Sequence, residues 1–266
     1  MGVVNCTPDS FSDGGRYLDC SAAVVRVRQL ISEGADIIDI GGESTRPGAL
    51  PVDPDEQIRR TAPVIAQLRQ FWDGPISIDT TKSPVATAAL DAGANWINDI
   101  SALRDDPAMV EIVSRLSCVT VLMHMKGTPR TMQAAPRYDD VVGEVTDFLA
   151  ARAKFAQENG IKADRIVVDP GIGFGKRLED NLAILRHLSQ IAQLGYPILV
   201  GASRKSFIGR LTGEEPDGRL EGSLAAAVWV ALNGAKIIRV HDVAATRKAL
   251  LVTRAIAEND NPPIER

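Results

Sequence analysis

The sequence predicts a single-domain α/β protein with the (β/α)8 or TIM-barrel fold. Short apolar segments rich in Val and Ile recur about every 30 residues, and helical patterns lie between them. Nearly continuous apolar character is typical of parallel strands that are buried on both faces. The length of 266 residues is close to the roughly 250 that such a barrel needs. A doubly wound open sheet is the alternative, but it usually has fewer strands and a glycine-rich turn after the first.

Eight strands are expected along the chain, and the first starts almost at residue 1. They are Gly2–Asn5, Asp36–Gly41, Pro75–Asp79, Trp96–Ile100, Val119–His124, Arg165–Asp169, Pro197–Gly201 and Lys236–His241.

The clearest helices between and after these strands have apolar residues at spacings of three and four. They are Ser21–Glu33, Pro107–Leu116, Leu178–Leu194 and Val243–Ala257. No linker or low-complexity stretch divides the chain, so residues 1–258 are expected to form one barrel and residues 259–266 a disordered tail.

Composition and charge narrow the class of protein. A net charge of −4 gives no domain-wide basic surface, which argues against nucleic acid as the main partner. No apolar run approaches the roughly 20 residues that span a bilayer, and no leader precedes the first strand. The odd count of three cysteines, without a CxxC pair, suits thiols in a reducing compartment, and a cytoplasmic protein is expected.

Polar side chains stand where nearly every expected strand ends. In a barrel these ends meet at one mouth, where active sites lie. The residues are Asn5, Asp39, Glu43, Thr45, Arg46, Asp79, Asn98, Asp99, His124, Asp169, Ser203, Arg204, Lys205, Arg239 and His241. Asp39, Asp99 and His124 could equally form buried pairs or hold loops, so their roles stay open.

Two groups at this mouth indicate a ligand. Asp79, Asn98 and Asp169 supply acceptors and one donor pair, which suits an N–H-rich heterocycle better than a metal cage. The cationic or polar Lys205, Arg239 and His241 come from the last two units, where barrels often bind phosphate.

The segment after the first strand carries acids, glycines and one Phe. Its composition fits either a hydrophilic connector or a lid over the site. If it is a lid, it is expected to be poorly ordered without substrates. It reads Asn5-Cys6-Thr7-Pro8-Asp9-Ser10-Phe11-Ser12-Asp13-Gly14-Gly15.

Several other motifs do not indicate chemistry. The glycines of 169–176 fit neither GxGxxG nor a phosphate loop ending in GK[ST] and are better explained as a tight turn. No GxSxG elbow surrounds Ser203 or Ser206, and no HxxxH pair suggests zinc.

Taken in order, seven motifs between Asn5 and His241 resemble those of the dihydropteroate synthase family. They are Asn5-x-Thr7-Pro8-Asp9-Ser10-Phe11-Ser12-Asp13-Gly14-Gly15, Gly41-Gly42-Glu43-Ser44-Thr45-Arg46-Pro47-Gly48, Ile78-Asp79-Thr80, Asn98-Asp99, Asp169-Pro170-Gly171-x-Gly173-Phe174-Gly175-Lys176, Ser203-Arg204-Lys205-Ser206 and Arg239-Val240-His241. The family is a pterin-binding TIM barrel that joins 6-hydroxymethyl-7,8-dihydropterin diphosphate to 4-aminobenzoate and releases pyrophosphate in folate synthesis. Sulfonamides compete with the aminobenzoate.

The resemblance assigns expected roles to individual residues. The pterin would contact Asp79, Asn98, Ile100, Met123, Asp169, Lys205 and Arg239. The 4-aminobenzoate pocket would comprise Phe11, Thr45, Arg46, Pro47, Phe174 and Ser206, together with Lys205. Asn5 would bind Mg²⁺ beside the diphosphate, which Arg239 and His241 would hold. Asp13, Arg46, Lys205 and Arg239 would act in catalysis, with Asp13 stabilising charge on the reacting pterin.

Two other functions remain possible on the same residues: a folate-dependent methyltransferase with a similar pterin grip, and a non-catalytic pterin-binding paralogue. The resemblance also implies a homodimer, for which the apolar stretch Leu224–Leu232 is the only direct indication. Family members usually carry a short segment before the first strand, whereas this chain begins on it. We expect that difference to affect stability more than chemistry.

Overall fold

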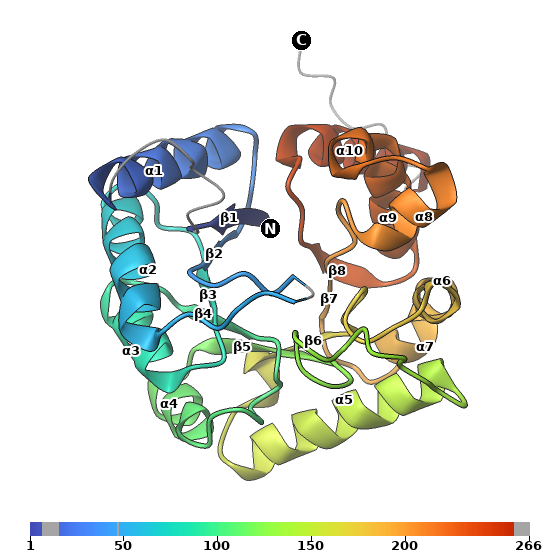
Figure 1. Cartoon of the computed structure of the whole chain (residues 1–266), viewed down its shortest axis with the longest axis horizontal. Helices are drawn as coiled ribbons and strands as arrows, with labels where there is room; N and C mark the ends of the chain where they lie inside the picture. The colour runs from blue at the N-terminus through green and yellow to red at the C-terminus, as the bar shows by residue number, and fades with distance from the viewer. Residues whose placement is uncertain (7–15, 47, 258–266) are drawn as a thin grey trace.

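A computed structural model of the chain describes residues 1–6, 16–46 and 48–257. Its eight strands are all parallel and pair in sequence order from β1 to β8. A parallel bridge between Gly2 and Val240 joins the first strand to the residues that follow the last. The strands therefore close into a barrel, and Figure 1 shows the helices arranged around it. The sequence-predicted TIM barrel is confirmed.

The strands are short, and all except β8 are almost entirely buried. They are β1 Gly2–Asn5, β2 Ile38–Gly41, β3 Ile76–Asp79, β4 Trp96–Asp99, β5 Val119–Met123, β6 Ile166–Asp169, β7 Ile198–Val200 and β8 Ala235–Ile238.

Ten α-helices and two short 3-10 helices connect or follow them within the described residues. They are α1 Arg16–Ser32, α2 Pro54–Arg69, α3 Ser83–Asp91, α4 Ala108–Leu116, α5 Val141–Glu158, η2 Ala163–Arg165, α6 Leu178–Arg186, α7 Leu188–Ala192, α8 Ser206–Thr212, η3 Pro216–Gly218, α9 Leu220–Leu232 and α10 Val243–Ala257.

The expected helix Leu178–Leu194 is two helices, α6 and α7, separated at His187. His187 has φ −108° and ψ 24°, which lies outside the helical region, so one continuous helix was the wrong prediction. Leu and Ile residues recur at helical spacing on both sides of the break, because both helices pack on the same core. Ile184, Leu188 and Ile191 are all buried there. Apolar periodicity alone could not reveal the break.

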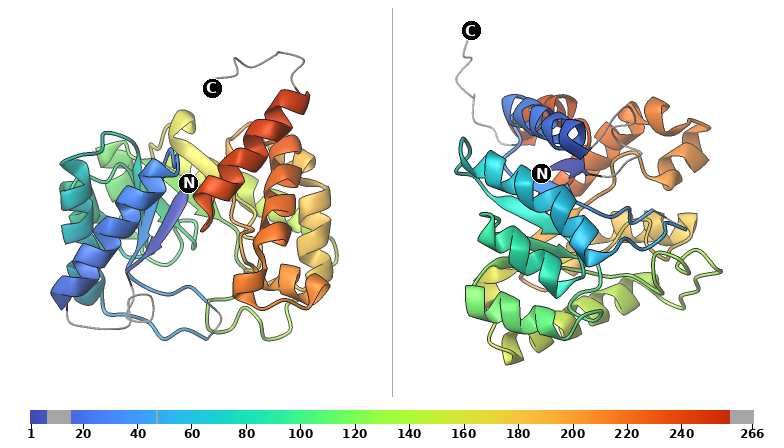
Figure 2. Two further views of the ribbon diagram at one scale, coloured as in Figure 1. Left: turned by 90° about the horizontal axis from the view of Figure 1, so that it is seen from above. Right: turned by 60° about the vertical axis from the view of Figure 1, so that its left-hand side comes forward.

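Apolar side chains close one end of the barrel. Met1, Ile37, Val121, Val167 and Leu199 form a buried cluster inside the strands. A larger core lies between the strands and the surrounding helices. Figure 2 shows the loops that follow β2 and β5 extending together from the opposite end. That open end is the carboxyl end of the strands, where the polar residues were predicted to meet.

Within the described residues, no helix combines the length and apolar character needed to cross a bilayer.

Candidate active site

Strand register brings the predicted polar residues into one layer of the barrel. Asn5 pairs with Gly41, Gly41 with Asp79, and Asp79 with Asn98. A Cβ atom on Gly41 would lie 3.5 Å from Asp79 Cβ and 3.9 Å from both Asn5 Oδ1 and Asp79 Oδ2. Side-chain oxygen atoms from two different strands therefore lie close to Gly41 at the mouth.

Arg239, which follows β8, spans the barrel interior. Its Nε donates to Asp39 Oδ2 at 2.6 Å, and its Nη2 donates to Asp79 Oδ2 at 2.9 Å. Asn98 Nδ2 also donates to Asp39 Oδ2, at 3.3 Å. Burial by itself would lower the Arg239 pKa, but the carboxylates of Asp39 and Asp79 raise it, so the guanidinium stays charged. Asp39 thus holds the Arg239 guanidinium beside Asp79.

Some buried polar atoms of this network lack a partner among the described residues. These atoms are Asp39 Oδ1, Ser77 Oγ and Asn98 Oδ1, all from β2, β3 and β4. Unpaired buried acceptors are costly, and a bound molecule with N–H groups would satisfy them. Asn98 Oδ1 and the Asp79 carboxylate therefore favour a donor-rich ligand edge.

Burial changes the charge state of the site. It raises the pKa of Asp79 to about 7, although Arg239 opposes the shift. It raises the pKa of Asp169 to about 6, against the hydrogen bond from the Gly171 amide. Burial also lowers the pKa of Lys205 to about 8, with Arg239 adding to the effect. Clustered shifts of this kind are typical of functional sites.

A small apolar cluster lies beside these charges. Ile100, Met123, Met125 and Met132 are buried together, and Phe174 packs against them. Lys205 Nζ lies 4.2 Å from the centroid of the Phe174 ring. Flat aromatic ligands bind between such apolar and cationic surfaces.

His241 is oriented by Ser203. The Ser203 Oγ accepts from the His241 backbone amide at 3.3 Å and lies 3.1 Å from His241 Nδ1. If the hydroxyl donates to Nδ1, then Nε2 carries the proton and can donate to an anion. Burial lowers the His241 pKa to about 4, and Arg239 reinforces this, so the ring is neutral.

Arg204 does not face the site. Its guanidinium donates two hydrogen bonds to the carboxylate of Asp242, at 3.0 and 2.7 Å.

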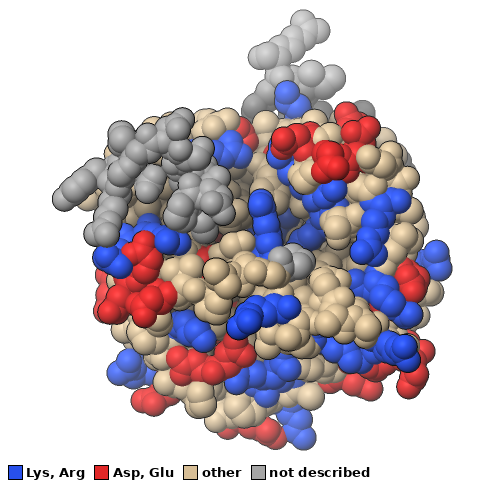
Figure 3. Space-filling view, viewed as in Figure 1, with Lys and Arg blue, Asp and Glu red and all other residues tan. Residues whose placement is uncertain are grey.

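A cleft of about 250 Å³ opens at this mouth. Its lining includes Thr45, Asp79 and Ile100 from the predicted site, with Lys82 and Arg130 as cations and Glu43 and Asp105 as further acids. Figure 3 shows Lys and Arg side chains gathered around the centre of this face, although the whole chain carries a net charge of −4. Local positive charge of this kind attracts anionic substrates.

Other predicted residues lie apart from this centre or outside the described structure. Arg46 is exposed on the loop after β2, and Ser206 is exposed at the first position of α8. Phe11, Asp13 and Pro47 lie outside the described residues.

The structure resolves the two remaining open roles. Asp99 accepts from the amides of Ser101 and Leu103 and so holds a turn. His124 is buried against Lys176, with its Nδ1 2.9 Å from the lysine Nζ.

Lys82, Arg130 and Lys176 are the residues that sequence reasoning missed. A single basic residue in a loop carries no spacing signal, so Lys82 and Arg130 could not be assigned. Lys176 was part of a recognised motif, but sequence does not reveal that its side chain turns inward.

The described residues contain no group of three or more His, Cys, Asp or Glu that could hold a metal ion.

Comparison with known proteins agrees with this geometry. Residues 1–241 match the pterin binding enzyme family. The dihydropteroate synthase of Neisseria meningitidis serogroup C is 49% identical over 264 residues, which cover 97% of this chain and 93% of that protein.

Solved structures show the same similarity. The dihydropteroate synthase of Xanthomonas albilineans with 4-aminobenzoic acid has a TM-score of 0.92 and 49% identity, covering 98% of this chain and 93% of that one. The Yersinia pestis enzyme in a sulfonamide drug complex has a TM-score of 0.92 and 42% identity, covering 97% and 93%.

These relatives are synthases and not the methyltransferases that the sequence left as an alternative. On this match, the chain belongs to the dihydropteroate synthases, the pterin-binding transferases of folate biosynthesis that join 6-hydroxymethyl-7,8-dihydropterin diphosphate to 4-aminobenzoate.

Proposed function

We propose that the pterin ring lies in the barrel mouth between Asp79, Asn98 and Asp169, with its N–H edge toward their oxygens. The unpaired Asn98 Oδ1 and the buried carboxylates of Asp79 and Asp169 support this orientation. Lys205 would donate to the pterin carbonyl. Ile100, Met123 and the planar guanidinium of Arg239 would contact the ring faces. Because Arg239 already donates to Asp79, pterin binding would have to share or replace that bond.

The 4-aminobenzoate would occupy the adjoining surface of Phe174, Lys205 and Ser206, with Thr45 and Arg46 at its entrance. The contact between Phe174 and Lys205 supports this placement, because it offers an aromatic face and a cation together. Phe11 and Pro47 would complete the pocket. Sulfonamides would bind on the same surface, as inhibitors.

The diphosphate would lie near Asn5, Arg239 and His241. Asn5 Oδ1 lies beside Gly41, which has no side chain to cover it, and a neutral His241 can donate through Nε2. Asn5 fits Mg²⁺ as a single hard oxygen ligand, because Mg²⁺ keeps waters and takes substrate phosphates. When bound, Mg²⁺ would neutralise charge on the diphosphate.

The reaction would proceed by breaking the C–O bond between the pterin methylene and the diphosphate, which leaves with the bonding electrons. The aminobenzoate nitrogen then forms the C–N bond and loses a proton. Arg239 and His241 would stabilise the leaving group, and buried carboxylates would stabilise positive charge on the pterin. The single observation that carries this assignment is the convergence of Asp79, Asn98 and Arg239 on one layer of the mouth.

The test supplies pterin diphosphate, 4-aminobenzoate and Mg²⁺ and measures pyrophosphate release. We expect turnover that stops when a chelator removes Mg²⁺ and returns when it is restored. Well-folded protein that binds pterin without releasing pyrophosphate would favour the non-catalytic paralogue.

Asp13 offers a test of the first loop. If this loop stabilises the reacting pterin and excludes water, Asp13→Ala should lower kcat at least about tenfold while pterin binding persists. Unchanged turnover with intact pterin binding would remove the loop from the mechanism.

The protein is also proposed to form a homodimer and to act in the reducing cytoplasm. Trp229, Leu232, Leu251, Val252 and Ile256 expose apolar surface on the neighbouring helices α9 and α10, which supports a subunit contact there. The thiols of Cys20 and Cys118 are not in disulfides. Sedimentation of the wild type and of a Leu232→Lys, Val252→Lys double variant would test the dimer, and a monomeric wild type would contradict it.

A further inference from the structure

Lys176 ends the glycine-rich segment after β6 but does not face the mouth. Its side chain is almost fully buried, with a residue exposure of 3%. Nζ lies 2.9 Å from the Gly171 carbonyl, 3.1 Å from the Phe174 carbonyl and 2.9 Å from His124 Nδ1. A lysine that bound the diphosphate would need an exposed ammonium, as in phosphate loops, so this residue has another role.

The ammonium lies inside the turn formed by its own segment. Gly171 and Phe174 belong to that turn, and their carbonyl oxygens converge on Nζ from two sides. His124, which follows β5, supplies two more acceptors, its Nδ1 and its backbone carbonyl at 3.4 Å. Lys176 therefore ties the turn both to itself and to the neighbouring strand.

The fold requires this turn to lie very close to β5. Gly171 and Gly175 have φ +69° and +64°, and a Cβ atom on them would overlap the carbonyl oxygens of His124 and Lys126 respectively. Glycines at such positions allow the approach but add flexibility to the chain. Directed hydrogen bonds are needed to select one conformation.

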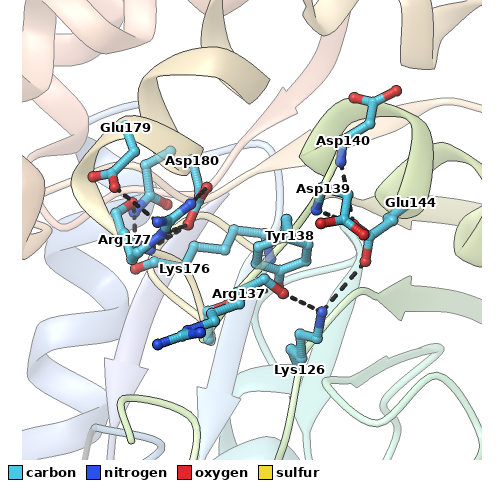
Figure 4. Close-up of polar contacts among 12 residues, drawn as sticks. Lys126, Arg137, Tyr138, Asp139, Asp140, Glu144, Lys176, Arg177, Glu179 and Asp180 are labelled. Atoms are coloured by element: carbon cyan, nitrogen blue, oxygen red, sulfur yellow. Dashed lines mark hydrogen bonds and ion pairs between the residues drawn. The ribbon is translucent and has the colours of Figure 1, made fainter. Parts of the chain in front are cut away.

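Further bonds secure the outside of the same turn. Tyr138 donates its hydroxyl to the Gly175 carbonyl at 2.7 Å, and Gln133 Nε2 donates to the Gly173 carbonyl at 3.0 Å. Figure 4 shows Lys176 extending from the cluster of Arg177 and Asp180 toward Tyr138. Among these contacts, only Lys176 brings a positive charge into the turn.

The turn carries two residues of the proposed site. Asp169 precedes it and accepts from the Gly171 amide at 2.7 Å, and Phe174 lies within it against Lys205. Lys176 bonds directly to the backbone of Gly171 and Phe174, so its loss would affect both positions.

We infer that Lys176 is a positioning residue for the aminobenzoate pocket: its buried ammonium fixes the Gly171–Gly175 turn so that Phe174 forms one wall. This inference rests on the proposed placement of 4-aminobenzoate against Phe174. Burial lowers the Lys176 pKa to about 7, with Asp169 opposing, as expected of an ammonium whose contacts are neutral acceptors. Burying an ammonium group costs free energy, so the stability of the fold alone does not explain a lysine here. Positioning of the turn does explain it.

The test compares Lys176→Met, which keeps the length and removes the charge, with wild type. We expect the KM for 4-aminobenzoate to rise about tenfold or more, while kcat at saturation changes less than about threefold. The melting temperature should fall as well, because Met leaves the carbonyls of Gly171 and Phe174 without this donor. Hydrogen exchange of the peptide containing residues 169–176 should become faster.

Arg177→Met is the matched control. Arg177 pairs with Asp180 at the start of α6, outside the turn, so its loss should lower the melting temperature without changing the KM for 4-aminobenzoate. Tyr138→Phe should change the KM in the same direction as Lys176→Met but less, because it removes one neutral donor.

The Phe174→Leu variant tests the role of Lys176 separately from the proposed placement of 4-aminobenzoate against Phe174. If Phe174→Leu leaves the KM for 4-aminobenzoate unchanged, the proposed pocket is wrong. If Phe174→Leu raises it but folded Lys176→Met does not, the role of Lys176 is overturned. Should Lys176→Met not fold, Lys176→Gln takes its place, and an unchanged KM in that variant overturns the inference equally.

Discussion

The Nε atom of Arg239 lies 2.6 Å from Oδ2 of Asp39, a carboxylate with no exposed surface. The two residues come from β2 and from the segment after β8, 200 residues apart in the chain. Asp39 therefore fixes the guanidinium plane while Nη2 remains bonded to Asp79. Preorganisation of this kind avoids reorganising the cation when substrate binds.

Asp39→Asn tests that relationship. Removing the carboxylate leaves a buried cation with one fewer partner, so the free energy of unfolding should fall by about 3 kcal/mol. The kcat/KM for pterin diphosphate should fall about tenfold, because Arg239 is no longer held in one orientation. Urea unfolding and steady-state kinetics measure the two effects. Asp217→Asn is the control, since Asp217 is a fully exposed partner of Arg204 and its loss should change neither quantity. Wild-type values for Asp39→Asn would contradict the role of Asp39.

Activity should depend on pH through the buried groups of the mouth. Asp169 and Asp79 have raised pKa values of about 6 and about 7, so both are ionised, and accept fully from pterin N–H groups, only above this range. Lys205, with its pKa lowered to about 8, loses its charge as the pH rises further. The kcat/KM for pterin diphosphate should therefore rise through pH 6 to 7 and fall above about pH 8. These apparent values belong to the coupled group of charges.

Lys205→Arg separates the two limbs of this profile. Arginine stays protonated, so the fall on the alkaline side should disappear while the rise on the acid side remains. Measurement at saturating 4-aminobenzoate isolates the pterin step. An alkaline limb that is identical in Lys205→Arg would assign it to a different group.

The sequence could predict the barrel because its signals are local and repeated. Each strand is a short Val- and Ile-rich segment, and the spacing alone implies eight units. Which polar residue faces the interior was harder to predict. Asn98 and Asp99 are adjacent on β4, so their side chains point to opposite sides. Asn98 reaches Asp39 inside the barrel, whereas Asp99 holds the turn after the strand.

The direction of a long side chain was not predictable either. Lys205 and Lys176 both follow strand-end motifs, yet one packs on Phe174 at the mouth and the other is enclosed by its own turn. The difference arises from the tertiary approach of the β6 turn to β5, which no spacing along the sequence records.

Ser203→Ala should weaken the diphosphate side of the site alone. The Ser203 hydroxyl is bonded to His241 Nδ1 and to its backbone amide, so its removal frees the ring and its tautomer. Loss of one such hydrogen bond should raise the KM for pterin diphosphate about fivefold. The KM for 4-aminobenzoate should stay unchanged. Inhibition by pyrophosphate should weaken by a similar factor. Thr253→Ala removes a hydroxyl that bonds only within α10 and should leave the kinetics unaltered. Equal changes in both KM values would show that Ser203 acts on the whole fold and not through His241.

Gly171→Ala should be far more destabilising than the same change at Gly195, although both glycines have similar positive φ values of +69° and +81°. A methyl group at Gly195 meets no heavy atom within 4 Å, so that variant isolates the backbone strain, about 1 kcal/mol. At Gly171 the methyl group would overlap the His124 carbonyl, and relief requires the turn to move away from β5. We expect a loss of about 3 kcal/mol or more in the free energy of unfolding.

The displaced turn carries Phe174, so the folded Gly171→Ala enzyme should also bind 4-aminobenzoate more weakly. The Gly195→Ala enzyme should bind it as the wild type does. Urea unfolding and binding titrations on the two variants measure this difference, and equal stability losses would mean that the turn does not need its close contact with the strand.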